Sequence, residues 1–344
     1  MILADTRASN ANLGQAAPTS ESGAIVRVTV TVPGRLHLGF VDLNGELGRR
    51  FGSLGLALDA PVTRVSAMPG QGLSVTGVDA ERARDYVERL IRHFGMAPDL
   101  TLKVESAIPD HVGLGSGTQL CLAVGAAVCR LAGLAPDARE IAQLLDRGAR
   151  SSIGIATFEQ GGVVLDGGRG EIDQPPPVIS RLPFPESWRI LLIFDEVRRG
   201  LHGRDESEAF QHLPALPAAS AAHLCRLMLM VALPALAEQD LDRFGAAVTE
   251  LQETIGDHFA PVQGARFLSA EVTETLVWLR GRGVRGVGQS SWGPTGFAFL
   301  GSDAAAAALL RDMRERWPPG IGLSFVIARG RNHGADIEIA RGGA

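Results

Sequence analysis

The sequence is nearly without lysine: Lys103 is the only one among 344 residues, and all the other Lys or Arg positions are arginines. A Walker-type phosphate loop ends in Gly-Lys-Ser or Gly-Lys-Thr, so the composition excludes this class of nucleotide-binding site. Lys103 lies in Thr-Leu-Lys-Val-Glu-Ser between strand-like neighbours, which argues against Schiff-base chemistry.

Cysteine is also scarce, with three residues in the whole chain. An odd and low count is typical of reduced thiols in the cytoplasm. Cys121 and Cys129 fall eight residues apart on one predicted helix, roughly 12 Å from each other, which is too far for a disulfide. We expect them to be small buried apolar residues.

The chain has no strong charge imbalance, since its net charge is −5 and its pI is about 5.9. Nothing in this balance indicates a nucleic-acid binder. No apolar run approaches the roughly 20 residues of a membrane span. The first 23 residues lack a basic start and a long apolar core, so they predict a flexible tail rather than a signal peptide.

Hydrophobic periodicity predicts a mixed α and β protein in both halves, and 344 residues are enough for two domains. The proline-rich stretch 173–179 is the best candidate linker. We expect a tail over 1–23, one domain over 24–178 and a second over 179–344. Strands are expected at 25–32, 63–68, 72–77, 100–107, 161–168, 189–196 and 323–328, with a strand, tight turn and strand over 283–301. Helices are expected at 80–94, 117–132, 137–149, 219–256, 268–282 and 303–317.

A glycine-studded loop, Ile-Pro-Asp-His-Val-Gly-Leu-Gly-Ser-Gly-Thr-Gln-Leu, separates a predicted strand from a predicted apolar helix. Glycines let backbone N–H groups crowd around an anion, and a helix start adds free donors and a partial positive charge. The alternative is an ordinary turn in which Ser116 caps the helix. Within the loop 109–118, the predicted phosphate-binding residues are Gly113, Leu114, Gly115, Ser116, Gly117 and Thr118.

Three blocks in this order resemble the motifs of the GHMP kinase superfamily: 32–45, the loop 109–118, and 286–299. In that superfamily the loop wraps nucleotide phosphates. The resemblance implies a two-domain α+β fold of mixed α/β order, with a ribosomal-S5-like amino-terminal domain and a ferredoxin-like carboxyl-terminal domain. Ligands are then expected in the cleft between the domains.

A narrower resemblance comes from Gly-Arg-Leu-His-Leu-Gly-Phe, Ser-Ser-Ile-Gly-Ile-Ala-Thr-Phe-Glu-Gln-Gly-Gly and Gly-Gln-Ser-Ser-Trp-Gly-Pro-Thr-Gly. These blocks resemble the β-ribofuranosylaminobenzene 5′-phosphate synthase family of tetrahydromethanopterin biosynthesis. That reaction joins 5-phosphoribosyl 1-diphosphate to 4-aminobenzoate or 4-hydroxybenzoate, and releases diphosphate and carbon dioxide. The stretch 152–158 lacks the aspartate that many GHMP kinases use as a base, which favours the synthase. An ATP-dependent kinase and an inactive ligand sensor of the same fold remain alternatives.

The resemblance implies Mg²⁺, with Ser116 and Glu159 as candidate ligands, and a homodimer as the assembly. Both substrates are small anions, and no nucleic acid or membrane partner is expected. Diphosphate and carboxylate suit arginine, whose fork binds both in a bidentate manner. The candidate catalytic residues are Arg35, His37, Asp42 and Glu159. The candidate substrate-binding residues are Arg49, Arg150, Ser151, Thr157, Gln289, Ser290, Ser291 and Trp292.

Simpler explanations exist for several of these candidates. Asp42 could cap the Asp-Leu-Asn-Gly turn. His37 could be a structural histidine, and Arg49 could belong to a solvated surface pair. Trp292 could cover a turn, or it could stack on a substrate ring.

Overall fold

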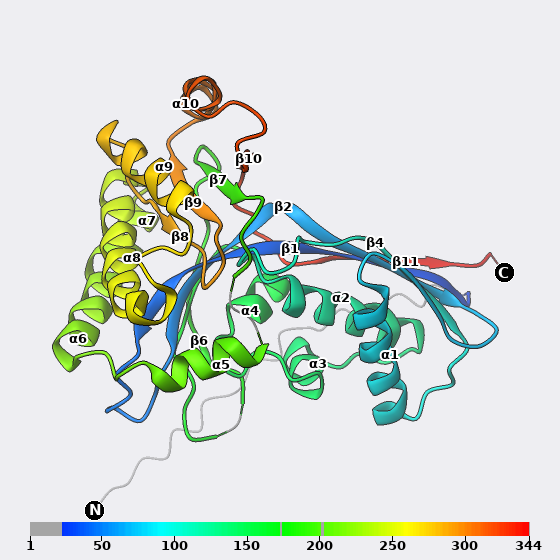
Figure 1. Ribbon diagram of the computed structural model, residues 1–344. Helices are drawn as coiled ribbons and strands as arrows, with labels where there is room; N and C mark the ends of the chain where they lie inside the picture. Colours follow the sequence, from blue (N-terminus) through cyan, green and yellow to red (C-terminus); the bar gives the residue numbers. More distant parts are fainter. Residues whose placement is uncertain (1–22, 173, 201–202, 344) are drawn as a thin grey trace, which may run out of the picture.

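The structure is a computed structural model that describes residues 23–172, 174–200 and 203–343. Two β-sheets stand side by side, and each is covered by helices (Figure 1). The expected tail, 1–23, lies outside the described residues apart from Gly23.

The larger sheet has the strand order β11-β1-β2-β4-β3, and β5 and β6 extend it from β2. Its centre is an antiparallel pair of 18-residue strands, β1 (Ile25–Asp42) and β2 (Gly52–Pro69). The pairing register shifts near Arg35, His37 and Asp42, as sheets often do beside functional sites. The other strands are β3 (Ser74–Gly77), β4 (Leu100–Ser106), β5 (Val163–Asp166), β6 (Val178–Leu182) and β11 (Asp336–Arg341).

Four helices cover one face of this sheet (Figure 1). The central helix, α2, is apolar on nearly every side, and residues 119–129 are all buried because it is enclosed by β1, β2 and the other three helices. Its burial fixes the position of its first turn, which carries the glycine loop. The helices are α1 (Ala80–Phe94), α2 (Ser116–Leu131), α3 (Ala138–Leu144) and α4 (Ile153–Glu159).

The smaller sheet is antiparallel throughout, with the order β10-β7-β9-β8. One face packs a core against α9 and α10, and the opposite face joins a large core that also contains Leu36, Phe40 and Leu54 of the first sheet. The two halves therefore share one apolar core. The elements are β7 (Arg189–Asp195), β8 (Gly288–Gln289), β9 (Gly296–Leu300), β10 (Leu323–Ala328), α9 (Ala270–Gly281) and α10 (Asp303–Arg316).

A helical layer closes the side where the two sheets meet (Figure 1). Its longest member, α8, packs on both β1 and β8, so it belongs to both halves of the molecule. The layer consists of α5 (Gly203–His212), α6 (Ala218–Leu227), η1 (Met228–Ala232), α7 (Leu233–Ala237) and α8 (Leu241–Gln263).

The run Ala218–Ala237 is long and apolar enough to cross a membrane by length and composition, so our expectation of no such run is wrong. Its inward residues Leu224, Met228 and Ala232 are buried in the shared core. A core helix of a soluble protein passes the same test, and the run carries no conclusion about a membrane.

The domain boundary that we placed at residue 178 stays a prediction, and strands of the first sheet lie on both sides of it. The strand β6 begins there and pairs with β5 of the first sheet. At the other end of the chain, β11 returns from the second half and pairs with β1. Both ends of the second half are thus part of the first sheet, which holds the two halves in a fixed relation.

Candidate functional site: an anion cleft beside an aromatic cluster

The glycine loop ends in a helix whose first turn has no side-chain cap. Gly115 is the N-cap residue with φ of 83°, and Ser116 is the first helical residue rather than the cap. The N–H groups at a helix start have no partner within the helix, and here no cap side chain satisfies them. They are available for an anion, which supports the phosphate interpretation of the loop over the simple turn.

A second glycine turn, between β8 and β9, locks the loop in place. The Ser290 hydroxyl donates to the carbonyl of Gly113 at 2.8 Å and accepts from the backbone N–H of His37 at 3.0 Å. A Cβ on Gly113 would lie 2.2 Å from the carbonyl oxygen of Ser290, and a Cβ on Gly293 would lie 2.3 Å from the amide nitrogen of Gly113. Only glycine fits at both positions, so backbone from both halves meets directly at the loop.

A cleft of about 180 Å³ opens in front of the loop. Arg35 anchors one wall, because its Nη1 donates to the carbonyl of Gly113 at 2.5 Å. Burial lowers the pKa of Arg35 to about 10, with Glu206 opposing the shift, so the guanidinium is still charged at neutral pH. The cleft is lined by Arg35, Arg82, His111, Gly113, Gly115, Ser116, Gly117, Thr118, Arg147, Gly203, Glu206, Ser291, Trp292 and Gly293.

Glu206 is the one carboxylate among the described residues that line this cleft, and no sequence pattern had indicated it. Its Oε2 lies 3.1 Å from Nη2 of Arg150. Burial raises the pKa of Glu206, while Arg150, Arg35 and Arg147 each act to lower it. The cleft therefore contains an internal carboxylate surrounded by guanidinium groups.

His37 lies two residues beyond Arg35 on β1 and is 3% exposed. Burial, together with the charges of Arg35 and Arg150, lowers its pKa to about 3, so the imidazole is neutral at pH 7. Neither ring nitrogen has a hydrogen-bond partner in the structure, and His37 lines a small cavity of about 20 Å³. A cavity of this size admits one water molecule or one small substituent.

An aromatic cluster adjoins His37 through Phe40, whose ring centre lies 4.5 Å from that of the imidazole. The cluster consists of Phe40, Phe51, Phe210, Phe259 and Trp292. Phe259 stacks on Trp292 with ring centres 4.1 Å apart and planes 14° from parallel. The face of Trp292 against Phe259 is thus already covered and cannot receive a substrate ring there. Ser291, with φ of 55°, lines both the small cavity and the anion cleft, so the two spaces adjoin.

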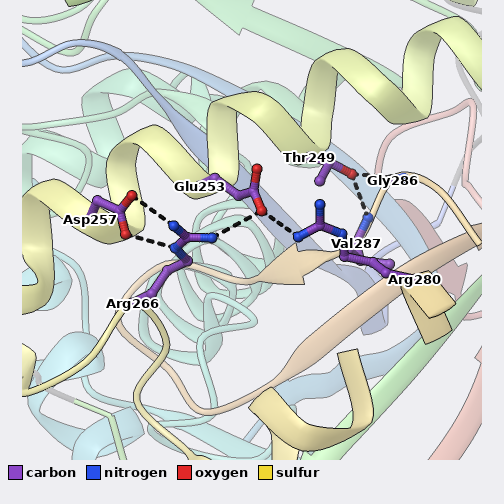
Figure 2. A network of polar contacts seen from close by, with 7 residues as sticks. All are labelled: Thr249, Glu253, Asp257, Arg266, Arg280, Gly286 and Val287. Carbon is purple, nitrogen blue, oxygen red and sulfur yellow. Dashed lines mark hydrogen bonds and ion pairs between the residues drawn. The ribbon is translucent and has the colours of Figure 1, made fainter. Parts of the chain in front are cut away.

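Helix α8 forms the far wall of the small cavity and is held by a network of ion pairs (Figure 2). Arg266 donates to Asp257 at 2.7 and 2.8 Å and to Glu253 at 2.9 Å. Glu253 also pairs with Arg280 of α9, so one carboxylate joins two arginines. Gln289 is buried and bonded to backbone and to Gln252 of α8, which makes it a structural residue of this wall.

Other predicted residues are already engaged within the chain. Asp42 accepts from the N–H groups of Asn44 and Gly45 at 2.7 and 3.2 Å, which is the turn-capping role. Arg49 donates to the carbonyls of Gly167 and Gly168, both at 2.7 Å. Neither side chain is among those lining the anion cleft.

The stretch after Arg150 is also mostly internal. Ser151 donates to the buried carboxylate of Asp166 at 2.9 Å. Thr157 is buried, donating to the carbonyl of Gly154 at 3.1 Å and accepting from Gln119 at 3.2 Å. Glu159, at the last turn of α4, is exposed. Partial burial raises the pKa of its carboxyl, and the charged groups that act on that pKa are Arg139 and Asp137, neither of which lines the cleft.

Comparison with known proteins gives two family matches. The model of the GHMP kinases N terminal domain matches residues 81–162, and that of the GHMP kinases C terminal domain matches residues 232–319. Among solved structures, a homoserine kinase from Cytophaga hutchinsonii has a TM-score of 0.60 at 18% identity, covering 95% of this chain and all of that one. A mevalonate diphosphate decarboxylase from Enterococcus faecalis has a TM-score of 0.63 at 15% identity, covering 92% and 100%. These structures establish the GHMP fold.

Curated relatives are more similar in sequence. The beta-ribofuranosylphenol 5′-phosphate synthase of Archaeoglobus fulgidus is 34% identical over 324 residues, covering 89% of this chain and 98% of the relative. The protein of the same name from Methanothermobacter thermautotrophicus is 32% identical over 338 residues, covering 90% and 98%.

Proposed function

This chain belongs to the beta-ribofuranosylphenol 5′-phosphate synthase family and has the GHMP kinase fold, and from that premise we propose how its cleft carries out the reaction. The enzyme is a pentosyltransferase that joins 5-phosphoribosyl 1-diphosphate to a 4-substituted benzoate. The relatives are named for a phenol product, which corresponds to 4-hydroxybenzoate as acceptor, and 4-aminobenzoate would give the aminobenzene product. We place this step in tetrahydromethanopterin biosynthesis, in the cytoplasm, with a homodimer as the working assembly.

The observation that carries the proposal is the pairing of an uncapped helix start with a neutral, buried histidine. In the reaction, the bond from ribosyl C1 to the diphosphate oxygen breaks, and C1 bonds to the ring carbon that bears the carboxylate. The bond to carbon dioxide then breaks, and its electron pair restores the aromatic ring. No proton is gained or lost, so the site needs anion stabilisation and no general base.

The leaving diphosphate would lie on the N–H groups at the start of α2 and against Arg35. Both are fixed before the substrate arrives, α2 by its burial and Arg35 by its bond to Gly113. Preorganised donors of this kind stabilise charge that develops as a bond breaks.

Mg²⁺ fits the donor set beside the loop. Arg82 Nη2 donates to the carboxylate of Asp110 at 2.8 Å. Burial acts to raise the pKa of Asp110, but the neighbouring Ser116 and Arg82 outweigh it and lower that pKa. Mg²⁺ bound with a diphosphate takes most of its ligands from water and phosphate, so one or two protein oxygens suffice. We propose Ser116 and Asp110 as the residues that would hold it, in place of Glu159, which is exposed at the end of α4 and does not line the cleft. The bound ion would neutralise charge on the leaving diphosphate.

The direct test is incubation of the protein with 5-phosphoribosyl 1-diphosphate, Mg²⁺ and carboxyl-labelled 4-hydroxybenzoate or 4-aminobenzoate. We expect labelled carbon dioxide and free diphosphate in equal amounts. No labelled carbon dioxide from either acid would overturn the proposal. Parallel reactions with ATP and a panel of alcohols test the kinase alternative, for which the stretch 152–158 provides no aspartate as a base.

A further inference from the structure

Only one of the two terminal nitrogens of the Arg150 guanidinium has a polar partner. Its Nη2 pairs with Oε2 of Glu206 at 3.1 Å, while its Nη1 is buried without a hydrogen-bond partner. A buried donor on a charged group costs free energy while it is unpaired, and a guanidinium is suited to the oxygens of an anion. The free Nη1 of Arg150 is thus a candidate donor to an anionic group of a substrate.

The surroundings of Arg150 are aromatic. Its guanidinium lies over the ring of Phe210 at 5.0 Å, and Phe210 packs edge-on against Phe40 and Phe51. Glu206 and Phe210 are four residues apart on α5, which places both side chains on one face of the helix. Arg150 thus already contacts a carboxylate and a phenyl ring together, which are the two parts of a benzoate.

The two anions of the reaction need separate places. Arg35 is bonded to the glycine loop, where the diphosphate belongs. Arg150 is next to the aromatic cluster instead. Resting on the function proposed above, we propose that Nη1 of Arg150 binds the acceptor's carboxylate and that Glu206 is the positioning residue that holds its other arm.

Glu206 also limits how strongly Arg150 holds that carboxylate. When the bond to carbon dioxide breaks, negative charge leaves the carboxylate, and its electron pair passes into the ring. A fully available guanidinium would stabilise the starting carboxylate more than the departing carbon dioxide, and so raise the barrier. Sharing the fork with Glu206 keeps the acceptor bound in place with less of this ground-state stabilisation.

The first experiment measures acceptor binding directly by calorimetry, with inorganic diphosphate and Mg²⁺ present and no turnover. We expect Arg150→Ala to weaken binding of 4-hydroxybenzoate at least tenfold. Binding of the uncharged 4-hydroxybenzamide, and of inorganic diphosphate, should change less than twofold. Arg150→Lys keeps the charge but not the fork and should weaken 4-hydroxybenzoate at least fivefold, which covers the case in which the alanine variant is unstable.

The second experiment separates KM from kcat. Glu206→Gln should lower the KM for the acceptor at least threefold and lower kcat at least tenfold. Both terminal nitrogens of Arg150 would then be available, and they would stabilise the acceptor's carboxylate more than the departing carbon dioxide. Glu206→Asp restores the charge and should return kcat to within threefold of wild type. Glu208→Gln changes an exposed carboxylate of the same helix and is the matched control.

Two outcomes overturn the inference. One is that Arg150→Ala and Arg150→Lys bind 4-hydroxybenzoate normally, or lose diphosphate instead. The other is that Glu206→Gln raises KM as kcat falls, which would make Glu206 structural only. Wild-type turnover is measured first: if it releases no carbon dioxide the proposed function fails, whereas turnover with unchanged Arg150 variants refutes only this inference.

Discussion

On β1, Arg35 keeps its charge at neutral pH while His37, two residues further along, is held neutral. Burial acts against the charge of both side chains, so burial alone does not separate them. Arg35 begins from a much higher pKa and has the carboxylate of Glu206 to oppose the shift. His37 has two arginines nearby and no acidic neighbour that raises its pKa.

The difference divides the site into a phosphate side and an aromatic side. On the phosphate side, the loop and Arg35 offer fixed donors and positive charge to an anion. On the aromatic side, the neutral His37 and the phenylalanine rings are packed beside the guanidinium of Arg150. A transfer that replaces carbon dioxide with a ribosyl group needs both sides. Diphosphate leaves as an anion, and the ring carbon that loses carbon dioxide must bond to the ribosyl carbon and not to a proton.

Breaking the phosphate side should have the largest effect. Gly113→Ala places a Cβ 2.2 Å from the carbonyl of Ser290, at a φ of 89° that side chains rarely adopt. Both obstacles are backbone, so the loop must move away from β8–β9. We expect kcat/KM to fall more than 100-fold, about 2.7 kcal/mol, measured by diphosphate release.

Gly117→Ala is the matched control for stability, because its Cβ meets only the flexible end of Arg147, at 3.4 Å. Chemical unfolding should show a clear loss for Gly113→Ala and a smaller one for Gly117→Ala. Equal unfolding free energies for the two variants would contradict the close contact between the two glycine turns.

The aromatic side can be tested through pH. Because the folded pKa of His37 is about 3, the unfolded chain binds more protons than the folded one between pH 3 and 6.5. This contribution to stability is present in full above pH 6.5 and is lost as the pH falls. Between pH 8 and 5, the free energy of unfolding should fall by about 2 kcal/mol on account of His37.

His37→Gln should remove that part of the pH dependence in urea unfolding curves recorded from pH 5 to 8. His93→Gln alters an exposed histidine of α1 and should leave the wild-type slope. A His37→Gln protein with an unchanged slope would show that the imidazole is protonated in the folded state, and the contrast with Arg35 would disappear.

The individual donors on the phosphate side should have intermediate effects. Ser116→Ala and Arg35→Ala should each lower turnover about tenfold or more, roughly 1.4 kcal/mol, if these groups stabilise developing charge. Arg92→Ala, an exposed arginine of α1, is the control. Wild-type rates in both site variants would refute their assignment to the leaving diphosphate.

Sequence patterns predicted the outline of the fold because most elements have a clear apolar period. The helix expected at 80–94 is α1 with the same bounds, since Ala83, Val87 and Leu90 repeat on one face. The strand expected at 25–32 extends instead to Asp42. Proline and glycine in its second half hid the extension, and the register shifts of β1 accommodate them.

The site was only partly predictable, for a related reason. The loop and its glycines form a local motif, so they could be proposed as a phosphate site from the sequence alone. Glu206 lies on α5, a polar segment in which we predicted no helix, and it reaches the cleft because Phe210 of the same helix packs into the aromatic cluster. Only the folded chain brings these distant residues together.

Glu159 gives the smallest expected effect and the sharpest limit on the site. It was our candidate for the metal and for the ribosyl charge, but α4 presents it to solvent near Arg139. Glu159→Gln should therefore keep kcat and the Mg²⁺ dependence within twofold of wild type, whereas Asp110→Asn should shift the Mg²⁺ requirement at least fivefold. A Glu159→Gln protein that needs much more Mg²⁺ would move the metal to the other end of α4 and separate it from the glycine loop.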